Sequence, residues 1–304
     1  MRNMFADTFY EAGKREKRLA VVVADISPAG SIQKFREDFP DRFVNTGVSE
    51  QIMIGMCAGM ALRGLQPFAY TIATFTLFRP FEFVRDDLCY QNLPVTVVGI
   101  GGGVTYSTLG GTHHAMEDVA VAGAIPNLSI IAPCDPAETK AATLWCADQT
   151  RGPVYLRLGK AGEPDLTEMA TPWIFGKLRY LKQGEDLCIF SYGPIMKLAL
   201  QVATACEEKG SSVSVISVHT LKPLDREGIA NALSRHKRAV VIEECVPHGG
   251  LAGQVKEIAC DERMDCPIHA FTLRDEFIHC YGSHADLLAA HGLDLHTILT
   301  RLQG

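Results

Sequence analysis

Short apolar runs recur along the first half of the chain and alternate with longer segments of mixed polarity. Four of these runs predict buried strands, at residues 19–24, 94–99, 128–132 and 154–158. Continuous apolar strands with helices between them indicate a parallel sheet that is covered on both faces. Such a sheet is built from right-handed βαβ crossovers.

The second half of the chain repeats this alternation after a stretch of prolines, glycines and mixed charges at 159–176, which is typical of a linker. We predict strands at 186–191, 213–218, 238–243 and 268–271, and helices at 196–209, 225–234, 251–259 and 286–302. The fold class is therefore α/β, with two domains that each contain a mostly parallel sheet flanked by helices. We set the domains at 1–165 and 181–304, with 166–180 between them.

The helix predicted at 51–62 is apolar all round, which indicates burial on all sides. Gly55 and Gly59 are four residues apart and therefore share one face. Small residues at this spacing allow another backbone to approach closely. The pattern fits tight packing inside one chain and a helix crossing at a subunit interface equally well.

Composition narrows the class of protein. The 304 residues are 47% apolar and 21% charged, which suits two folded domains. The net charge of −6 is spread along the chain, and no basic stripe suggests nucleic acid. No apolar run approaches the ~20 residues of a membrane span. The ten cysteines include no CxxC pair, and residues 1–17 are too polar for a signal peptide, so we expect a cytoplasmic protein.

Glu50 stands in the turn that leads into the apolar helix. A carboxylate in the first turn of a helix is often only a favourable partner of the helix dipole. Here the apolar surroundings would also remove the carboxylate from water, which favours its protonated form and suits it to share a proton.

An aromatic run follows, in which Phe75, Phe78 and Phe81 are spaced by three. Ordinary core packing explains such a stripe, but a flat heteroaromatic ligand would need the same kind of wall.

Glycine-rich sequence follows the strand at 94–99 and leads into the segment GGTHHAMED, which contains His113 and His114. Loops at the carboxyl ends of parallel strands are common ligand sites, although this one does not match a dinucleotide fingerprint. The histidines suit acid–base work near neutral pH. A metal site with Glu117 is a weaker interpretation, because the spacing is not HExxH.

Taken together, these segments resemble the transketolase family. The matching stretches are FVNTGVSEQIMIGMCAGMALRGLQPF, ATFTLF, GGTHHAMED, IPNLSIIAPCDPAE and GPVYLRL, followed by TLKPLD and EECVPHGGLAGQV. The first five resemble the pyrimidine-binding domain and the last two the C-terminal domain. The resemblance covers nearly the whole chain, and the order and spacing of the stretches make it specific.

The resemblance implies thiamine diphosphate as cofactor. It assigns Glu50 as the catalytic residue that hydrogen-bonds the aminopyrimidine and activates the cofactor. It implies that Phe78 lies against the pyrimidine ring and that Phe75 and Phe81 complete the wall. It also implies that Asp25 is an acidic residue near the cofactor at the subunit interface.

For the substrate, the resemblance implies that His113 contacts the sugar oxygens and moves protons. It implies that Arg157 grips a sugar phosphate, a task suited to a planar guanidinium. Two positions depart from the family: Leu109 stands where an Asp usually reads a substrate hydroxyl, and Gly101 falls near a usual histidine. These departures point to a substrate other than the usual pentose phosphates.

The family's Gly-Asp-Gly motif and its following Asn, which hold magnesium and the diphosphate, do not occur in this sequence. The resemblance therefore implies a second chain, an N-terminal-section subunit that supplies the diphosphate site and its Mg²⁺ or Ca²⁺, in an assembly with two copies of each subunit. We expect no metal ligands in this chain, and no nucleic-acid or membrane partner.

Three functions stay open at this point. The first is transfer of a two-carbon ketol unit from a ketose, phosphorylated or otherwise modified, to an aldehyde acceptor. The second is a synthase or decarboxylating reaction on a 2-oxo acid, similar to deoxyxylulose-phosphate synthase or a 2-oxo-acid dehydrogenase β subunit. The third is a non-catalytic partner subunit.

Overall fold

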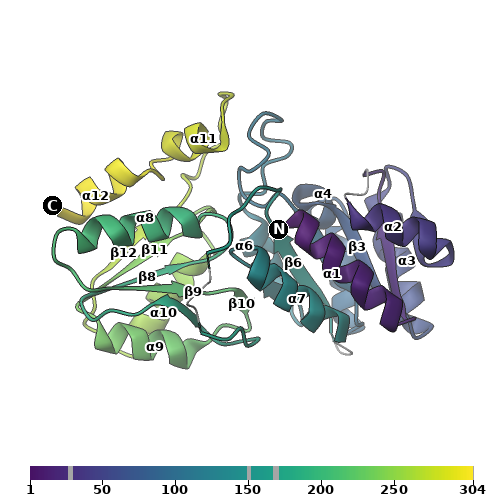
Figure 1. Cartoon of the computed structure of the whole chain (residues 1–304), viewed down its shortest axis with the longest axis horizontal. Coiled ribbons are helices and arrows are strands. Elements are labelled where there is room, and N and C mark those ends of the chain that lie inside the picture. The colour runs from purple at the N-terminus through teal and green to yellow at the C-terminus, as the bar shows by residue number, and fades with distance from the viewer. Residues whose placement is uncertain (27–29, 149–151, 167–170, 304) are drawn as a thin grey trace.

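The computed structural model describes residues 1–26, 30–148, 152–166 and 171–303, which form two α/β units joined side by side (Figure 1). The elements of the first unit are α1 (Arg2–Arg15), β1 (Leu19–Val23), α2 (Ser31–Asp38), η1 (Pro40–Arg42), β2 (Phe43–Asn45), α3 (Glu50–Leu62), β3 (Gln66–Ile72), α4 (Ala73–Leu77), α5 (Phe81–Phe83), η2 (Val84–Tyr90), β4 (Thr96–Ile100), α6 (Asp118–Ala124), β5 (Ser129–Ile131), α7 (Pro136–Asp148) and β6 (Val154–Leu158). Those that follow are β7 (Arg179–Lys182), β8 (Leu187–Ser191), α8 (Met196–Glu207), β9 (Val213–Ser217), β10 (Thr220–Lys222), α9 (Arg226–Arg235), β11 (Arg238–Ile242), α10 (Leu251–Asp261), β12 (Ile268–Phe271), α11 (His284–Ala290) and α12 (Leu295–Gln303).

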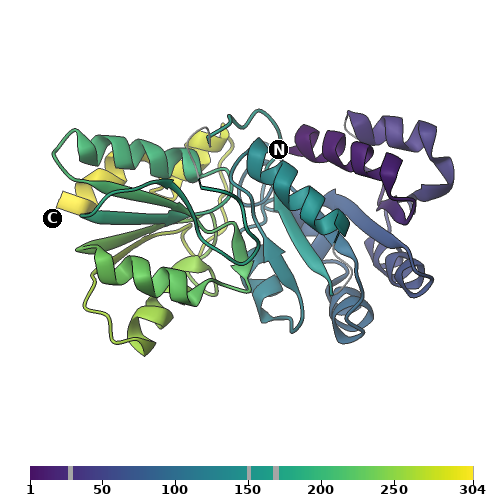
Figure 2. The same cartoon turned by 60° about the horizontal axis from the view of Figure 1, so that its bottom comes forward.

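The first sheet has the strand order β10-β5-β6-β4-β3-β1-β2. Its strands are parallel except β10, which pairs antiparallel with β5 although it comes from the second half of the chain. Helices α1, α2 and α7 cover one face, where Phe5, Phe9 and Phe35 pack together. Helices α3 and α6 cover the other face (Figure 2). The sheet is buried on both sides, as its continuous apolar strands require.

The second sheet has the order β12-β11-β8-β9-β7, with only β7 antiparallel. Helices α8, α11 and α12 pack on one face, and α9 and α10 lie on the other. The apolar cluster under α9 and α10 continues without a break into the cluster under α3 and α6. The two units therefore share one of their cores.

The structure confirms the predicted fold class of two α/β units with mostly parallel sheets. The predicted strands are present, and the strand at 154–158 has the predicted bounds. The single helix predicted at 286–302 is wrong, because Gly292 adopts a left-handed φ of 77° and separates α11 from α12.

The domain boundaries at 165 and 181 stay a prediction, and part of the predicted linker, at 167–170, lies outside the described residues. None of the described helices is long and apolar enough to cross a bilayer.

A buried ion pair lies where the two units meet. The Nε of Arg157 in β6 donates to Oδ2 of Asp118 at 2.8 Å, and the hydroxyl of Tyr155 donates to the same oxygen at 2.7 Å. The guanidinium also donates to the main-chain oxygen of Glu244, in the second unit, at 3.0 Å. Arg157 and Asp118 are 2% and 0% exposed. Each charge is therefore compensated only by the other and by nearby protein groups.

We expect Asp118→Asn to lower the free energy of unfolding by about 3–5 kcal/mol, because it leaves the Arg157 guanidinium buried without its counter-ion. Urea titration of the full chain measures this loss. The matched control is Asp261→Asn, which breaks an exposed ion pair with Arg226 and should cost no more than about 1 kcal/mol. Equal losses in the two variants would contradict the prediction.

Candidate functional site

The turn before α3 places Glu50 at the carboxyl ends of β1 and β2. The hydroxyl of Thr46 donates to the carbonyl oxygens of Val23 and Ser49 at 3.2 and 3.3 Å, which fixes the turn against β1. The Oδ1 of Asn45 accepts the backbone N–H of Asp25 at 3.0 Å. Glu50 is 3% exposed, and Asp25 is exposed beside the same turn. Both acids predicted near a cofactor thus lie at one edge of the sheet.

Arg79 joins Glu50 to the aromatic run. Its Nη1 donates to the two carboxylate oxygens of Glu50 at 3.1 and 3.2 Å. Its guanidinium also lies over the ring of Phe75, 4.4 Å from the centroid. Arg79 was not predicted from the sequence, although an arginine inside a run of phenylalanines is a usable signal because a charge there needs a partner.

His113 completes this group. Its ring meets the ring of Phe75 edge-on at 5.1 Å, and its Nδ1 lies 2.9 Å from the hydroxyl of Thr112. Burial, together with the positive charge of Arg79, lowers the pKa of His113. Its imidazole is therefore neutral at neutral pH and can accept a proton or share one with a hydroxyl. We call Glu50, Phe75, Arg79 and His113 the Glu50 cluster.

The other two phenylalanines of the run have different contacts. Phe78 and Phe81 are partly buried and pack against the apolar cluster under α3. Of the three phenylalanines, Phe75 has the contacts with Arg79 and His113. Leu109 is 49% exposed on the loop after β4, which projects from the same side of the molecule as the loop before α11 (Figure 1).

The glycines after β4 serve protein packing. A Cβ on Gly102 would lie 2.5 Å from the guanidinium carbon of Arg157, and a Cβ on Gly103 would lie 2.4 Å from the carboxylate of Glu244. A Cβ at either position would therefore require the neighbouring side chain to move. These two glycines therefore leave room for the side chains of other residues at the junction of the two units.

Arg157, which is predicted to grip a sugar phosphate, is buried in this structure. Its guanidinium is buried between the two units and is held by Asp118 and by the main-chain oxygen of Glu244. These contacts join the two units, and the contact of Arg157 with a sugar phosphate stays a prediction.

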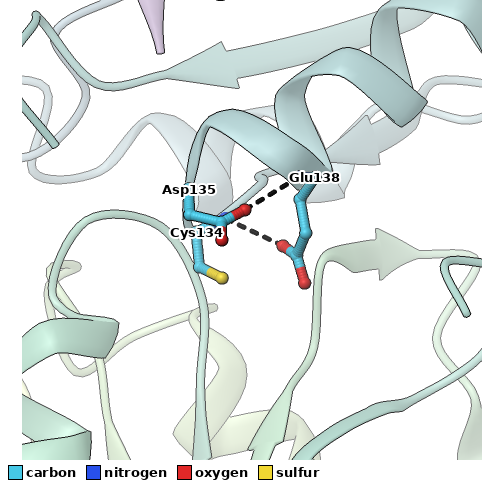
Figure 3. A group of neighbouring side chains, drawn as sticks. All are labelled: Cys134, Asp135 and Glu138. Carbon is cyan, nitrogen blue, oxygen red and sulfur yellow. Dashed lines mark hydrogen bonds between the residues drawn. The ribbon is translucent and has the colours of Figure 1, made fainter. Parts of the chain in front are cut away.

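His114 and Glu117, considered as metal ligands with His113, do not form a ligand group. Burial lowers the pKa of His114 and raises that of Glu117. Within the described residues, the side chains close enough together to hold an ion are Cys134, Asp135 and Glu138 (Figure 3).

The carboxylates of that group are already occupied by protein donors. Asp135 accepts the backbone N–H groups of Glu138 and Leu166 at 2.8 and 2.9 Å. Glu138 accepts the N–H of Cys134, the hydroxyl of Ser217 and a guanidinium N–H of Arg179, at 2.8, 3.1 and 3.1 Å. Burial raises the pKa of the Cys134 thiol, which keeps it protonated. The group therefore links α7 to strands β7 and β9 of the second unit.

One face of α3 lies open, contrary to the expectation of burial on all sides. Ile52 and Leu62 are 56% and 62% exposed. Within the part of the chain that the structure describes, a Cβ built on Gly55 or Gly59 would meet no atom within 4 Å beyond its chain neighbours and the nearby backbone of α3 itself. These four residues recur at helical spacing on one face, which we call the open face of α3. An exposed apolar stripe with small residues at its centre is typical of a helix-packing interface.

Comparison with known proteins gives one family. The family model of the transketolase pyrimidine binding domain matches residues 1–162, and that of the transketolase C-terminal domain matches residues 176–298. An apulose-4-phosphate transketolase subunit of Phocaeicola vulgatus is 32% identical over 294 residues, which cover 96% of this chain and 93% of that protein. A 6-deoxy-6-sulfo-D-fructose transketolase subunit of Clostridium sp. strain MSTE9 is 30% identical, over 93% of this chain and 86% of that protein.

Among solved structures, one described as a split gene transketolase in an inactive beta4 tetramer superimposes with a TM-score of 0.87. Its sequence is 31% identical, and the match covers 99% of this chain and 96% of that chain. The similarity therefore extends over both units and their connection.

We expect Arg79→Gln to raise the pKa of His113, because it removes a positive charge that disfavours the imidazolium. Titration of the histidine ring signals by NMR on the full chain measures this pKa. Arg85→Gln is the control, since Arg85 is an exposed arginine of the same region that pairs with Asp86. A His113 pKa unchanged by Arg79→Gln would show that this charge is not felt at the imidazole.

Proposed function

The chain belongs to the transketolase family, and we propose that it is one subunit of a two-chain, thiamine-diphosphate-dependent transketolase that is active only with its partner. The observation that carries the proposal is the buried Glu50 carboxylate, which Arg79 links to the ring of Phe75, itself in contact with the imidazole of His113. A buried acid next to an aromatic face suits an aminopyrimidine, which presents ring nitrogens at its edge and a flat face to stack.

In this proposal Glu50 shares a proton with the pyrimidine edge, Phe78 lies against the ring, and Phe75 and Phe81 complete the aromatic wall. Asp25 lies near the same edge. The bound cofactor supplies the electron sink for breaking and forming the ketol carbon–carbon bond. Arg79 must share or release the Glu50 carboxylate when the pyrimidine binds, and its side chain, 47% exposed, can move without disturbing the core.

The proposed reaction transfers a two-carbon ketol unit from a ketose to an aldehyde acceptor. His113 contacts the substrate oxygens and accepts a proton, for which its neutral form is suited. The relatives named for apulose 4-phosphate and 6-deoxy-6-sulfofructose support a phosphorylated or modified sugar. The side chain of Leu109 offers no hydrogen bond to such a sugar. We therefore propose that the part of the substrate that lies against Leu109 carries no hydroxyl group.

We propose that the partner is an N-terminal-section transketolase subunit, which binds the diphosphate and its Mg²⁺ or Ca²⁺, in an assembly with two copies of each chain. The open face of α3 supports a helix-packing contact, either between copies of this chain or with the partner. The names of the relatives as subunits support a partner chain.

We further propose that the domains are divided at 165 and 181 and that the protein works in the cytoplasm. All ten cysteines are free, and seven of them are buried, as expected of thiols that serve as small apolar side chains in a reducing compartment.

We expect Glu50→Gln to lower kcat of the assembled enzyme by at least about a hundredfold, since an amide cannot share a proton with the pyrimidine as a carboxyl group does. The experiment co-expresses the chain with its partner and measures sugar turnover, together with deuterium exchange at C2 of thiamine diphosphate.

Glu82→Gln, at an exposed acid on α5, is the control for the loss of one negative charge. If Glu50→Gln exchanged the C2 proton at the wild-type rate, the role proposed for this carboxylate would be wrong.

Gly59→Leu should leave the chain folded, and more stable by up to about 1 kcal/mol, because leucine favours a helix over glycine and no neighbour occupies the space. It should also prevent assembly, which light scattering after size exclusion measures. Gly253→Leu on α10 is the control, as that glycine is exposed and equally free of neighbours. Normal assembly of Gly59→Leu would remove the open face of α3 from the interface.

A further inference from the structure

Glu244 follows β11 and lies inside the junction of the two units. Its side chain is 1% exposed. One carboxylate oxygen accepts the backbone N–H of Val104 at 2.6 Å and lies 2.9 Å from Nε2 of His284. The second unit thus places the Glu244 carboxylate against the loop that follows β4. The counter-ion of this carboxylate, His284, also belongs to the second unit.

The loop is shaped to receive this carboxylate. Gly103, with a left-handed φ of 66°, leaves the space that Glu244 fills. Gly103 also pairs with Ala115 through two backbone hydrogen bonds of 3.0 and 2.8 Å. Ala115 follows His113 by two residues. The pairing of Gly103 with Ala115 therefore connects the contact between Glu244 and residues 103–104 to the histidine of the Glu50 cluster.

Further contacts hold the same loop. The N–H of Val246 donates to the carbonyl oxygen of Met116 at 2.9 Å. Arg157 binds the main-chain oxygen of Glu244 and lies 3.5 Å from that of Ala115. From the second unit, Glu244 contacts the loop through a charged side chain, whereas Val246 does so through its backbone.

We propose that Glu244 is a positioning residue: from the second unit it sets the place of the His113 loop, and His284 of α11 is the counter-ion that keeps its carboxylate in place. The proposed stabilisation of residues 101–118 by Glu244 is independent of the reaction that the protein catalyses. The effect on turnover rests on the proposed function, in which His113 contacts the substrate.

The charges around Glu244 agree with this role. Burial acts to raise the pKa of Glu244, but His284 and Arg157 outweigh it and leave the pKa below its usual value. The carboxylate in turn raises the pKa of His284, to which Glu163 adds. His114 and His291 also face the carboxylate, and burial lowers the pKa of both.

These directions define the pH range over which the pair is charged. Below the raised pKa of His284 and above the lowered pKa of Glu244, both partners carry their charges. The interaction of Glu244 with the loop weakens as the pH rises through the pKa of His284. It also weakens as the pH falls through the pKa of Glu244.

The test compares Glu244→Gln with wild type by hydrogen exchange of the full chain and by kinetics of the assembled enzyme. Glutamine can still accept the Val104 N–H but does not attract His284. We expect amide exchange in residues 101–118 to become about tenfold faster, with exchange in α8 unchanged. We also expect kcat to fall about tenfold, with the apparent affinity for thiamine diphosphate within about twofold of wild type.

Glu244→Asp keeps the charge and should recover part of both losses. His284→Gln leaves Glu244 in place and should accelerate exchange of the same loop. The wild-type protection of the loop should decline above the pKa of His284, whereas the His284→Gln variant should show no such decline. Lys237→Gln, which breaks an exposed ion pair with Asp186 in the second unit, is the control.

Unchanged exchange of residues 101–118 in both Glu244→Gln and His284→Gln would overturn the proposal. Acceleration spread equally over α8 and the loop would also overturn it, since the pair would then only stabilise the fold. If the wild-type assembly lacks transketolase activity, the proposed function fails, but the exchange measurement still decides whether Glu244 holds the loop.

Discussion

The buried pair of Arg157 and Asp118 is the constraint on which the rest of the structure depends. Arg157 lies near the end of β6, an inner strand of the first sheet, and Asp118 begins the helix that follows the histidine loop. An arginine enclosed at this point needs a carboxylate nearby, glycine at position 102 to leave room, and a carbonyl oxygen from the second unit. The carboxylate, the glycine and the carbonyl oxygen each contact or border the Arg157 side chain from a different element. Together these contacts determine how the two units pack against each other.

The alternation of apolar strands and helices was sufficient to predict both units, because a sheet buried on both faces leaves a plain pattern in the sequence. Elements held by tertiary contacts were harder to predict. Helix α1 has a polar sequence. Its buried Phe5 and Phe9 can be assigned to the core only when the sheet beneath them is known. Strand β10 joins a sheet whose other strands lie far away in the sequence, and no local pattern indicates such a pairing.

The candidate site could likewise be predicted only in part, because some of its contacts depend on tertiary packing. Glu50, Phe75 and His113 belong to stretches that resemble a family, and the structure brings them together around Arg79. Their grouping could be expected from strand ends that meet at one edge of a sheet. The contacts of Arg157 could not, because Asp118 and Glu244 come from two different units and only the packed junction joins them.

The open face of α3 has a consequence for how a cell must make this protein. A chain without its neighbours exposes an apolar helix surface to water, and such surfaces associate with whatever matches them. The solved relative described as an inactive beta4 tetramer is a case in which four copies of one chain assemble without activity. The open face of α3 in this chain is such an apolar surface, so making the chain together with whatever covers that face limits its non-specific association.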